Sequence, residues 1–205
     1  SALTLAIAVD ALGADKVRRF FAEILADENA SVPLFLKDLL QQHLQDLARL
    51  EQRIEAIDKQ LAEWAKTNQQ AMTLLQMLGV GVITATAFAA GVCDAQLFEN
   101  GRQFAAWLGL VPRQYSSGGK NKLGSITKAG DVYLRTMLAQ GARSIVFNAK
   151  KKSDPFSLWI QRLLERAGMN KTVIAVAAKQ ARIMWAIMAK NQDYQPERIC
   201  SPLSA

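Results

Sequence analysis

Hydrophobic residues recur at helical spacing along most of this 205-residue chain, beginning with residues 14–28. Five apolar side chains in that segment follow the spacing i, i+3, i+4, i+7, i+8, which is typical of one face of an amphipathic helix. They are Val17, Phe20, Phe21, Ile24 and Leu25. Asn29 and Pro33 interrupt the pattern, so we expect the first helix to end before them.

A longer apolar pattern begins near Pro33, a residue suited to the first position of a helix. From Leu47 onward its apolar residues alternate at spacings of three and four, which is a heptad repeat. The seam consists of Leu36, Leu40, Leu47, Leu50, Ile54, Ile57, Leu61 and Trp64, with His43 as a polar residue that helps to set register. We expect residues 33–67 to form a coiled-coil arm for self-association, because no second stretch repeats the heptad. An antiparallel pair within one chain is the alternative.

A capping signal and a glycine pair follow the heptads. Thr67 to Gln70 reads T-x-x-Q, a capping box that predicts a new helix near residue 68. Gly79 and Gly81 then separate two apolar runs with the spacing of a helix-hairpin-helix. Such a turn exposes backbone N–H groups at the next helix's start, where a phosphate can bind. A plain interhelical turn is the alternative.

The second half of the chain predicts four more helices around one glycine-rich segment. Residues 100–110 form the first, ended by Gly109 and Pro112, and residues 113–130 form a loop or a small hairpin. The next helix runs from about Asp131 to Asn148. Its expected buried residues are Val132, Leu134, Leu138, Ala142, Ile145 and Val146.

The last two helices carry their own start signals. Asp154 is an N-cap followed by Pro155, and this helix runs to about Ala167. Asn170 is the expected cap of the final helix, residues 171–190. That helix is apolar nearly all round, so it should be the central core helix.

These patterns together predict an all-α fold with a coiled-coil arm and a compact helical domain containing a helix-hairpin-helix-like turn. The expected parts are an N-terminal helical arm over 1–32, the coiled coil over 33–67, the helical domain over 68–190 and a flexible tail over 191–205. No run of about 18 uncharged apolar residues occurs, so we expect no membrane partner. The chain begins without Met, which suggests a processed chain or a fragment.

The charge of the chain is unevenly distributed around a net value of +7. Residues 1–112 carry 9 basic and 13 acidic side chains (net −4), residues 113–152 carry 9 and 1 (net +8), and residues 153–205 carry 7 and 4 (net +3). A clustered basic segment favours a polyanion partner, most often nucleic acid. A solvated loop is the alternative.

Histidine and cysteine are too few for several kinds of site. A single histidine, His43, excludes the common His-based zinc sites and any Ser-His-Asp triad within this chain. Cys93 and Cys200 form no disulfide framework, which indicates a reduced cytosolic chain.

The stretch RQYSSGGKNK, residues 113–122, holds the candidate chemistry. Ser117 and Lys120 fit S-x-x-K, the motif of serine acyl-enzymes, but Gly118-Gly119 opposes the helix that this motif opens. A P-loop also fails, because Asn121 follows Gly119-Lys120. What remains is a serine hydroxyl on a glycine-flanked loop among Arg113, Lys120, Lys122 and Lys128. Such cations suit phosphate binding, and they also suit attack on a DNA phosphate with a transient phosphoserine link.

Three segments resemble the C-terminal transposase domain of the insertion sequence 110 family of bacterial transposases (insertion sequence 116/110/902 type), a relative of the Piv DNA invertases. They are LLQMLGVGVITATAFAAGVCD, FENGRQFAAWLGLVPRQYSSGGKNKLGSITKAGDVYLRTMLAQGARSIV and NKTVIAVAAKQARIMWAIMA. The resemblance covers about residues 70–190, and the coiled coil before it also fits the family's layout.

This resemblance implies a catalytic serine, Ser117, because Ser-Gly is the constant part of the family's loop; Ser116 is the alternative. It also implies phosphate contacts by basic residues of the motif. The residues that we expect to contact nucleic acid are Arg113, Lys120, Lys122, Lys128, Arg135, Arg143, Gly79 and Gly81.

Full-length members of the family have an N-terminal ribonuclease-H-like domain with four acidic residues that bind divalent metal. They assemble as oligomers and use a guide (bridge) RNA to choose DNA. No such acidic set appears here, so we expect Mg²⁺ in a separate N-terminal domain, no cofactor in this chain, and no complete recombination by it alone. We expect the protein in the bacterial cytoplasm, associated with the nucleoid. A non-catalytic basic module that only grips DNA or guide RNA, and a coiled-coil scaffold, are the alternatives.

Overall fold

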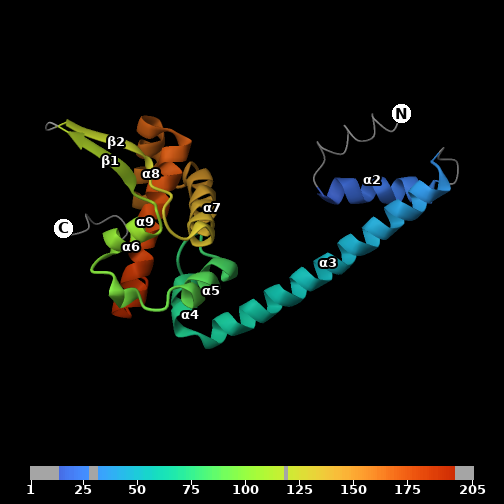
Figure 1. The fold of residues 1–205 in the computed structure, drawn as a ribbon, viewed down its shortest axis with the longest axis horizontal. Helices are drawn as coiled ribbons and strands as arrows, with labels where there is room; N and C mark the ends of the chain where they lie inside the picture. The colour runs from blue at the N-terminus through green and yellow to red at the C-terminus, as the bar shows by residue number, and fades with distance from the viewer. Residues whose placement is uncertain (1–13, 28–31, 118–119, 197–205) are drawn as a thin grey trace. The chain divides into compact units, whose positions relative to one another are not determined.

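The computed structural model describes residues 14–27, 32–117 and 120–196, apart from the side chains of residues 14, 15, 115–117 and 120–123. The described residues are largely helical, with one two-stranded sheet (Figure 1). The predicted all-α fold is therefore confirmed. The chain divides into two compact units between Lys59 and Gln60, inside helix α3 (Leu34–Thr67). The domain boundaries expected at residues 32, 67 and 190 stay predictions.

The first unit contains helix α2 (Ala14–Ala26) and α3 as far as Lys59, and the two helices lie side by side in Figure 1. Arg18 on α2 forms an ion pair with Glu51 on α3, and Lys37 Nζ donates to the Asp27 carbonyl over 3.1 Å. All five apolar residues expected on one face of α2 are half-buried. The α2 helix thus covers part of α3 with the side that the sequence pattern indicated.

Helix α3 is continuous over 34 residues, as the heptad pattern predicted. Its seam is largely exposed: Leu47 is 37% exposed, Leu50 52%, Ile54 58% and Ile57 51%, whereas Leu40 is buried. His43 is also exposed. An exposed heptad seam is the surface that a partner helix would cover, so the coiled coil stays a prediction.

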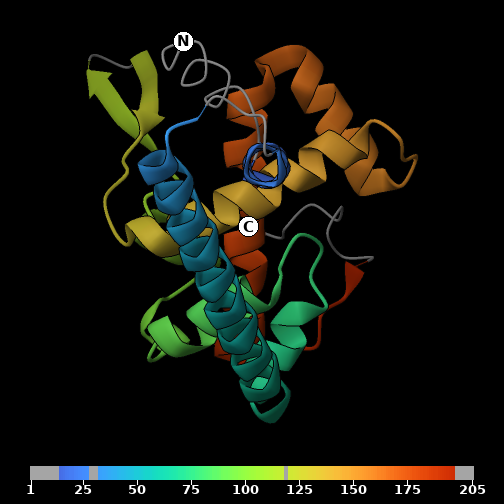
Figure 2. The same ribbon diagram turned by 90° about the vertical axis from the view of Figure 1, so that its right-hand side faces the viewer.

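Helix α9 (Met169–Lys190) is the centre of the second unit. It packs against α4 (Gln69–Leu75), α6 (Gly101–Trp107), α7 (Val132–Ala149), α8 (Pro155–Ala167) and the short 3₁₀ helix η1 (Ala95–Leu97). Figure 2 shows α7 lying across α9. The prediction that the last helix forms the core is confirmed: its buried residues from Thr172 to Met188 form one broad face, and its other residues over that span are half-buried.

Among the described residues, α9 is the one helix long and apolar enough to cross a membrane. Half of its most apolar 18-residue window is buried inside the unit. Core helices of globular proteins share this composition, because they are surrounded by other apolar side chains.

The helix starts refine the expected caps. Asp154 caps α8 as predicted: its carboxylate accepts from Ser157 N over 3.0 Å and from Ser157 Oγ over 2.6 Å. These bonds hold the pKa of Asp154 below its usual value. Two other caps were wrong. Helix α4 is capped by Asn68, whose Oδ1 accepts from Ala71 N, and not by Thr67, whose hydroxyl donates to the Trp64 carbonyl.

Helix α9 begins after Gly168 and not at Asn170. The Gly168 φ of 76° reverses the chain, so the helix starts two residues earlier than the asparagine signal indicated. Val132 was also wrongly assigned to the core of α7 and is 65% exposed. It is the first residue of its helix, where no preceding turn covers it.

The Gly79–Gly81 turn joins α4 to α5 (Val82–Gly91) and lies against α7. A Cβ on Gly141 would lie 2.2 Å from the Gly79 carbonyl oxygen, so α7 and the turn touch through their backbones. From α9, Gln180 Nε2 donates to the Leu78 carbonyl over 2.6 Å. Two neighbouring helices therefore fix the turn.

We expect Gly141→Ala to destabilise the protein by roughly 1–3 kcal/mol, because its methyl group would overlap the Gly79 backbone. Gly91→Ala is the matched control: its Cβ would meet Leu134 Cδ1 at an ordinary 3.6 Å. That control should be neutral or stabilising by up to about 1 kcal/mol, since alanine favours a helix more than glycine. Urea unfolding measures both, and equal stabilities would contradict the backbone contact.

Candidate nucleic-acid interface

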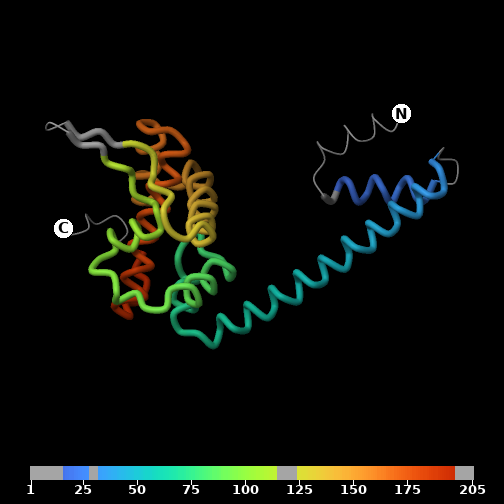
Figure 3. The backbone as a smooth tube through the Cα atoms, viewed as in Figure 1, coloured from blue at the N-terminus to red at the C-terminus, as the bar shows by residue number. Residues whose placement is uncertain are grey.

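The glycine-rich segment forms an antiparallel hairpin of β1 (Pro112–Ser117) and β2 (Lys120–Ile126). Figure 3 traces the chain from α6 into β1 and back from β2 into α7. In the backbone register Ser117 is opposite Lys120, and Ser116 is opposite Asn121. Of the two structures expected for residues 113–130, a loop or a small hairpin, the hairpin is confirmed. The Gly118-Gly119 connection and the side chains of Ser116, Ser117, Lys120 and Lys122 lie outside the described residues.

Two glycines let the segments before and after the hairpin pack backbone to backbone. A Cβ on Gly130 (φ 97°) would lie 1.8 Å from the Trp107 carbonyl oxygen. A Cβ on Gly109 (φ 71°) would lie 2.1 Å from the Ala129 carbonyl oxygen. Lys128 N donates to the Gly109 carbonyl over 3.2 Å. We call this contact of residues 107–111 with 127–131 the hairpin base.

Lys128 adopts a left-handed conformation in the hairpin base, with φ 55°. This conformation costs a non-glycine residue roughly 1–2 kcal/mol, so the surrounding contacts must hold it. The neighbouring Thr127 N donates to the Val111 carbonyl over 2.9 Å. The chain therefore presents the exposed Lys128 from a constrained backbone.

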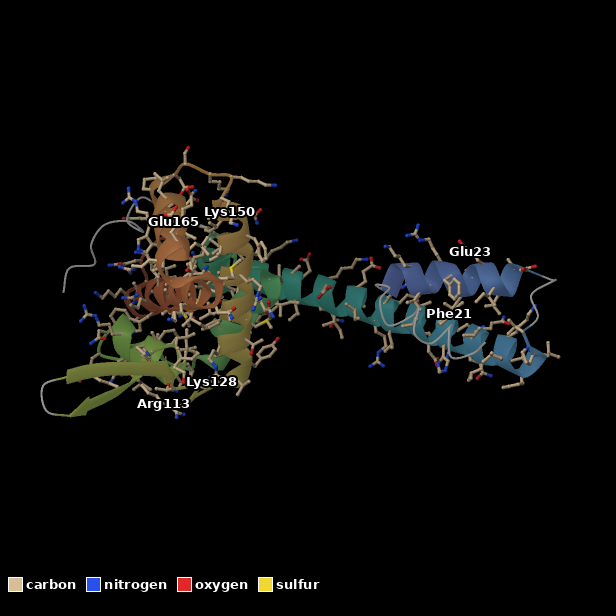
Figure 4. The ribbon with its side chains drawn as sticks, turned by 90° about the horizontal axis from the view of Figure 1, so that it is seen from above. Phe21, Glu23, Arg113, Lys128, Lys150 and Glu165 are labelled. Atoms are coloured by element: carbon tan, nitrogen blue, oxygen red, sulfur yellow. The ribbon has the colours of Figure 1, made fainter. Side chains whose placement is uncertain are left out.

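Three of the predicted phosphate ligands meet at the hairpin base. Arg113 Nη2 donates to the Thr127 carbonyl over 3.2 Å, which places Arg113 beside Lys128 (Figure 4). Arg135 Nη1, from the first turns of α7, donates to the carbonyls of Leu108 (3.2 Å), Gly130 (3.4 Å) and Asp131 (3.4 Å). Arg135 thus connects both sides of the hairpin base, and its hydrogen bonds go to backbone carbonyls of the protein.

The base cations and the predicted nucleophile lie at opposite ends of the hairpin. Arg113 and Ser117 are four residues apart on β1, or roughly 13 Å at strand rise. The register puts Lys120 next to Ser117 at the loop end instead. A nucleic acid bound along the hairpin would therefore meet two groups of cations, one at each end.

The remaining predicted ligands lie apart from the hairpin base. Arg143 is exposed on α7, and its distance from Arg135 along the helix is about 12 Å. It is two residues from Gly141, so it leaves α7 on nearly the opposite side from the Gly79–Gly81 turn. Gly81 caps α5 without a side-chain hydrogen bond. Phosphate binding at that turn, and the helix-hairpin-helix assignment, stay predictions.

A lysine-rich turn was not singled out from the sequence. Lys150, Lys151 and Lys152 are exposed between α7 and α8, and Figure 4 shows Lys150 well away from Arg113 and Lys128. Gln161 Nε2 donates to the carbonyls of Ala149 (2.8 Å) and Lys152 (2.9 Å) and so closes this turn. The run of three lysines before the N-cap Asp154 could have indicated this basic turn from the sequence. Nothing in the sequence indicates that Gln161 closes the turn.

No group of three or more His, Cys, Asp or Glu side chains among the described residues is placed to hold a metal ion. Cys93 is exposed and is a free cysteine.

Several curated proteins are similar to this chain. A probable family 20 transposase from Pseudomonas aeruginosa is 43% identical over 173 residues, covering 84% of this chain and 51% of the relative. The transposase for insertion sequence element IS1111A from Coxiella burnetii is 38% identical over 181 residues, covering 87% and 50%. The pilin gene-inverting protein of Moraxella bovis is 26% identical over 129 residues, covering 62% and 39%.

These relatives are named as transposases and as a gene-inverting protein, which places the matching part of this chain among proteins of the transposase class. Residues 71–157 form a domain of the transposase IS116/IS110/IS902 family, whose sequence model they match. The family resemblance expected from the sequence is confirmed. The chain spans about half the length of the curated transposases cited above.

Arg135 and Arg143 should respond differently to substitution. Arg135→Gln should lower stability by about 1–3 kcal/mol, because it removes a charged donor shared by three carbonyls. Arg143→Gln, at an exposed position on the same helix, should change stability by less than about 0.5 kcal/mol. Urea unfolding compares the two variants, and equal losses would contradict the bracing role of Arg135.

Proposed function

We propose that this chain provides the nucleophile and part of the nucleic-acid grip of a DNA transposase. The observation that supports it most directly is the hairpin register, which sets Ser117 opposite Lys120 beside a two-residue connection. This hairpin lies inside the segment that matches the transposase family. In the proposed step, the Ser117 oxygen forms a bond to a DNA phosphorus while one bond from that phosphorus to a deoxyribose oxygen breaks. The phosphoserine link keeps the bond energy for rejoining.

The cations of the hairpin would assist this step electrostatically. A serine hydroxyl is a weak nucleophile until a base takes its proton or a positive field stabilises the alkoxide. Lys120 is next to Ser117 in the register, and further donors at the hairpin base would neutralise neighbouring phosphates. The general base belongs, in this proposal, to a separate domain.

Further elements of the proposal concern the whole protein. We propose that a separate acidic domain binds Mg²⁺, that a guide RNA selects the DNA, and that the protein acts at the nucleoid in the bacterial cytoplasm. We also propose that this chain alone does not complete strand exchange.

A second function is favoured by a different observation. Exposed cations lie at the hairpin base, on α7 at Arg143 and in the turn of Lys150 to Lys152, so basic surface is not confined to the serine. Such a surface suits a non-catalytic module that grips DNA or guide RNA, with Ser116 and Ser117 as phosphate ligands. The two functions differ in whether a covalent adduct with DNA forms.

The nucleophile is tested by comparing Ser117→Ala with Ser116→Ala in a full-length enzyme, using DNA that traps the covalent adduct. Ser117→Ala should reduce the adduct to background, because no oxygen remains to bond the phosphorus. Ser116→Ala should retain it and is the matched control, one residue away on the same strand. If Ser117→Ala retains the adduct, the assignment fails, and normal strand exchange without either serine would favour the non-catalytic module.

Self-association through α3 is the second testable part of the proposal. Ile54→Asp should raise the dissociation constant at least about tenfold, since burying an isoleucine contributes about 1.5–3 kcal/mol. Gln52→Asp is the control, because Gln52 lies on the polar side of the same helix. Sedimentation measures both variants. A monomeric wild-type chain, or equal effects of the two substitutions, would contradict a coiled-coil seam.

A further inference from the structure

Two arginines lie together where α6 begins against α9. A Cβ on Gly101 would lie 3.0 Å from Arg182 Cα and 3.1 Å from the Arg182 carbonyl oxygen, so the first residue of α6 packs on the α9 backbone. Arg102 is the next residue. Its guanidinium therefore starts from the same crossing as that of Arg182, and the helices leave little room between them.

The backbone that carries Arg102 is fixed by its neighbours. Asn100 Oδ1 accepts from Arg102 N over 2.9 Å and from Gln103 N over 3.0 Å. Gln103 Oε1 accepts in return from Glu99 N over 2.6 Å. Just upstream, Trp185 Nε1 donates to the carbonyls of Ala95 and Phe98 and anchors this segment on α9. The backbone position of Arg102 is thus set before any ligand binds.

The two positive charges face an electrostatic cost. Arg182 is half-buried, with its Nε donating to the Ala178 carbonyl over 3.1 Å. Burial, and then the nearby charge of Arg102, lower the pKa of the Arg182 guanidinium. Neither arginine forms an ion pair with a carboxylate among the described residues. Like charges this close, one of them partly desolvated, are stabilised by an anion between them.

We propose that Arg102 and Arg182 together bind one backbone phosphate of a nucleic acid, at a site distinct from the hairpin. Guanidinium groups present forked N–H donors that match phosphate oxygens, and two of them neutralise the phosphate more fully than one. The Leu108 carbonyl, in the hairpin base, accepts a hydrogen bond from Arg135. Arg102 lies six residues before Leu108, which is roughly 9 Å along the helix. One stretch of nucleic acid can therefore reach both sites, and this inference rests on the proposed function.

The test measures nucleic-acid binding by fluorescence anisotropy with the 205-residue chain, using labelled duplex DNA and an RNA hairpin of equal length at several salt concentrations. Arg102→Met and Arg182→Met keep the apolar stems and remove the charges. Each should weaken binding roughly tenfold and reduce the salt slope by about one. The double variant should lose little more than the worse single variant, because both arginines contact the same phosphate. Weakening with DNA only or RNA only identifies which nucleic acid supplies the phosphate.

The matched control is Arg162 and Arg166 on α8, two exposed arginines four residues apart on one helix. Their single substitutions to Met should have small effects that add in the double variant. Additive effects at Arg102 and Arg182 would overturn the shared site. The shared site would also be overturned if Arg102→Met left the affinity unchanged while Arg113→Gln and Lys128→Gln weakened binding. That result would leave the proposed function standing. If the wild-type chain binds neither probe at low salt, both proposals fail.

A second readout does not depend on binding. Arg102→Met should raise Tm at low salt, because it relieves repulsion of the half-buried Arg182 charge, and the gain should shrink as salt screens that charge. Arg102 is exposed, so this variant should fold. A lower Tm would mean that the Arg102 charge is already satisfied within the protein, and it would overturn the proposal.

Discussion

The backbone contact between Gly130 and the Trp107 carbonyl determines where the hairpin leaves the helical unit. No side chain fits between the backbone at Gly130 and the backbone at Trp107, so α6, the hairpin and α7 are held tightly together at one point. Arg135 then holds both sides of that point through three carbonyls. The direction of the hairpin, and hence the place of the predicted nucleophile, depends on this contact.

Hydrogen bonds between arginines and backbone carbonyls also determine the electrostatics of the second unit. Its cations make few bonds to carboxylates, and several are occupied with backbone carbonyls instead, as Arg135, Arg113 and Arg182 are. A carbonyl fixes a guanidinium in place but does not cancel its charge. For the proposed binding of a nucleic acid, these side chains are already held in place, so little of the binding free energy would be spent on ordering them.

Much of the fold could be predicted from local patterns. Helical periodicity identified α2, α3, α7 and α9, and glycine content identified the hairpin segment, because these signals arise from neighbours in sequence. The caps at Asn68 and Gly168 were missed, since a nearby threonine or asparagine gives an equally good local signal and tertiary packing decides between them. Arg102 and Arg182 are 80 residues apart, so only the packing of α6 on α9 brings them together. The candidate serine came from family resemblance, and geometry alone would have left a phosphate-binding loop.

The hairpin also behaves as a lever. Ser117 stands roughly 13 Å from Arg113 along β1, so a tilt of about 10° at the base would carry the serine backbone through about 2 Å. Displacements of that size matter for an in-line attack, which requires close and aligned atoms. The position of the proposed nucleophile would therefore be set by the stiffness of a glycine contact one strand-length away from it.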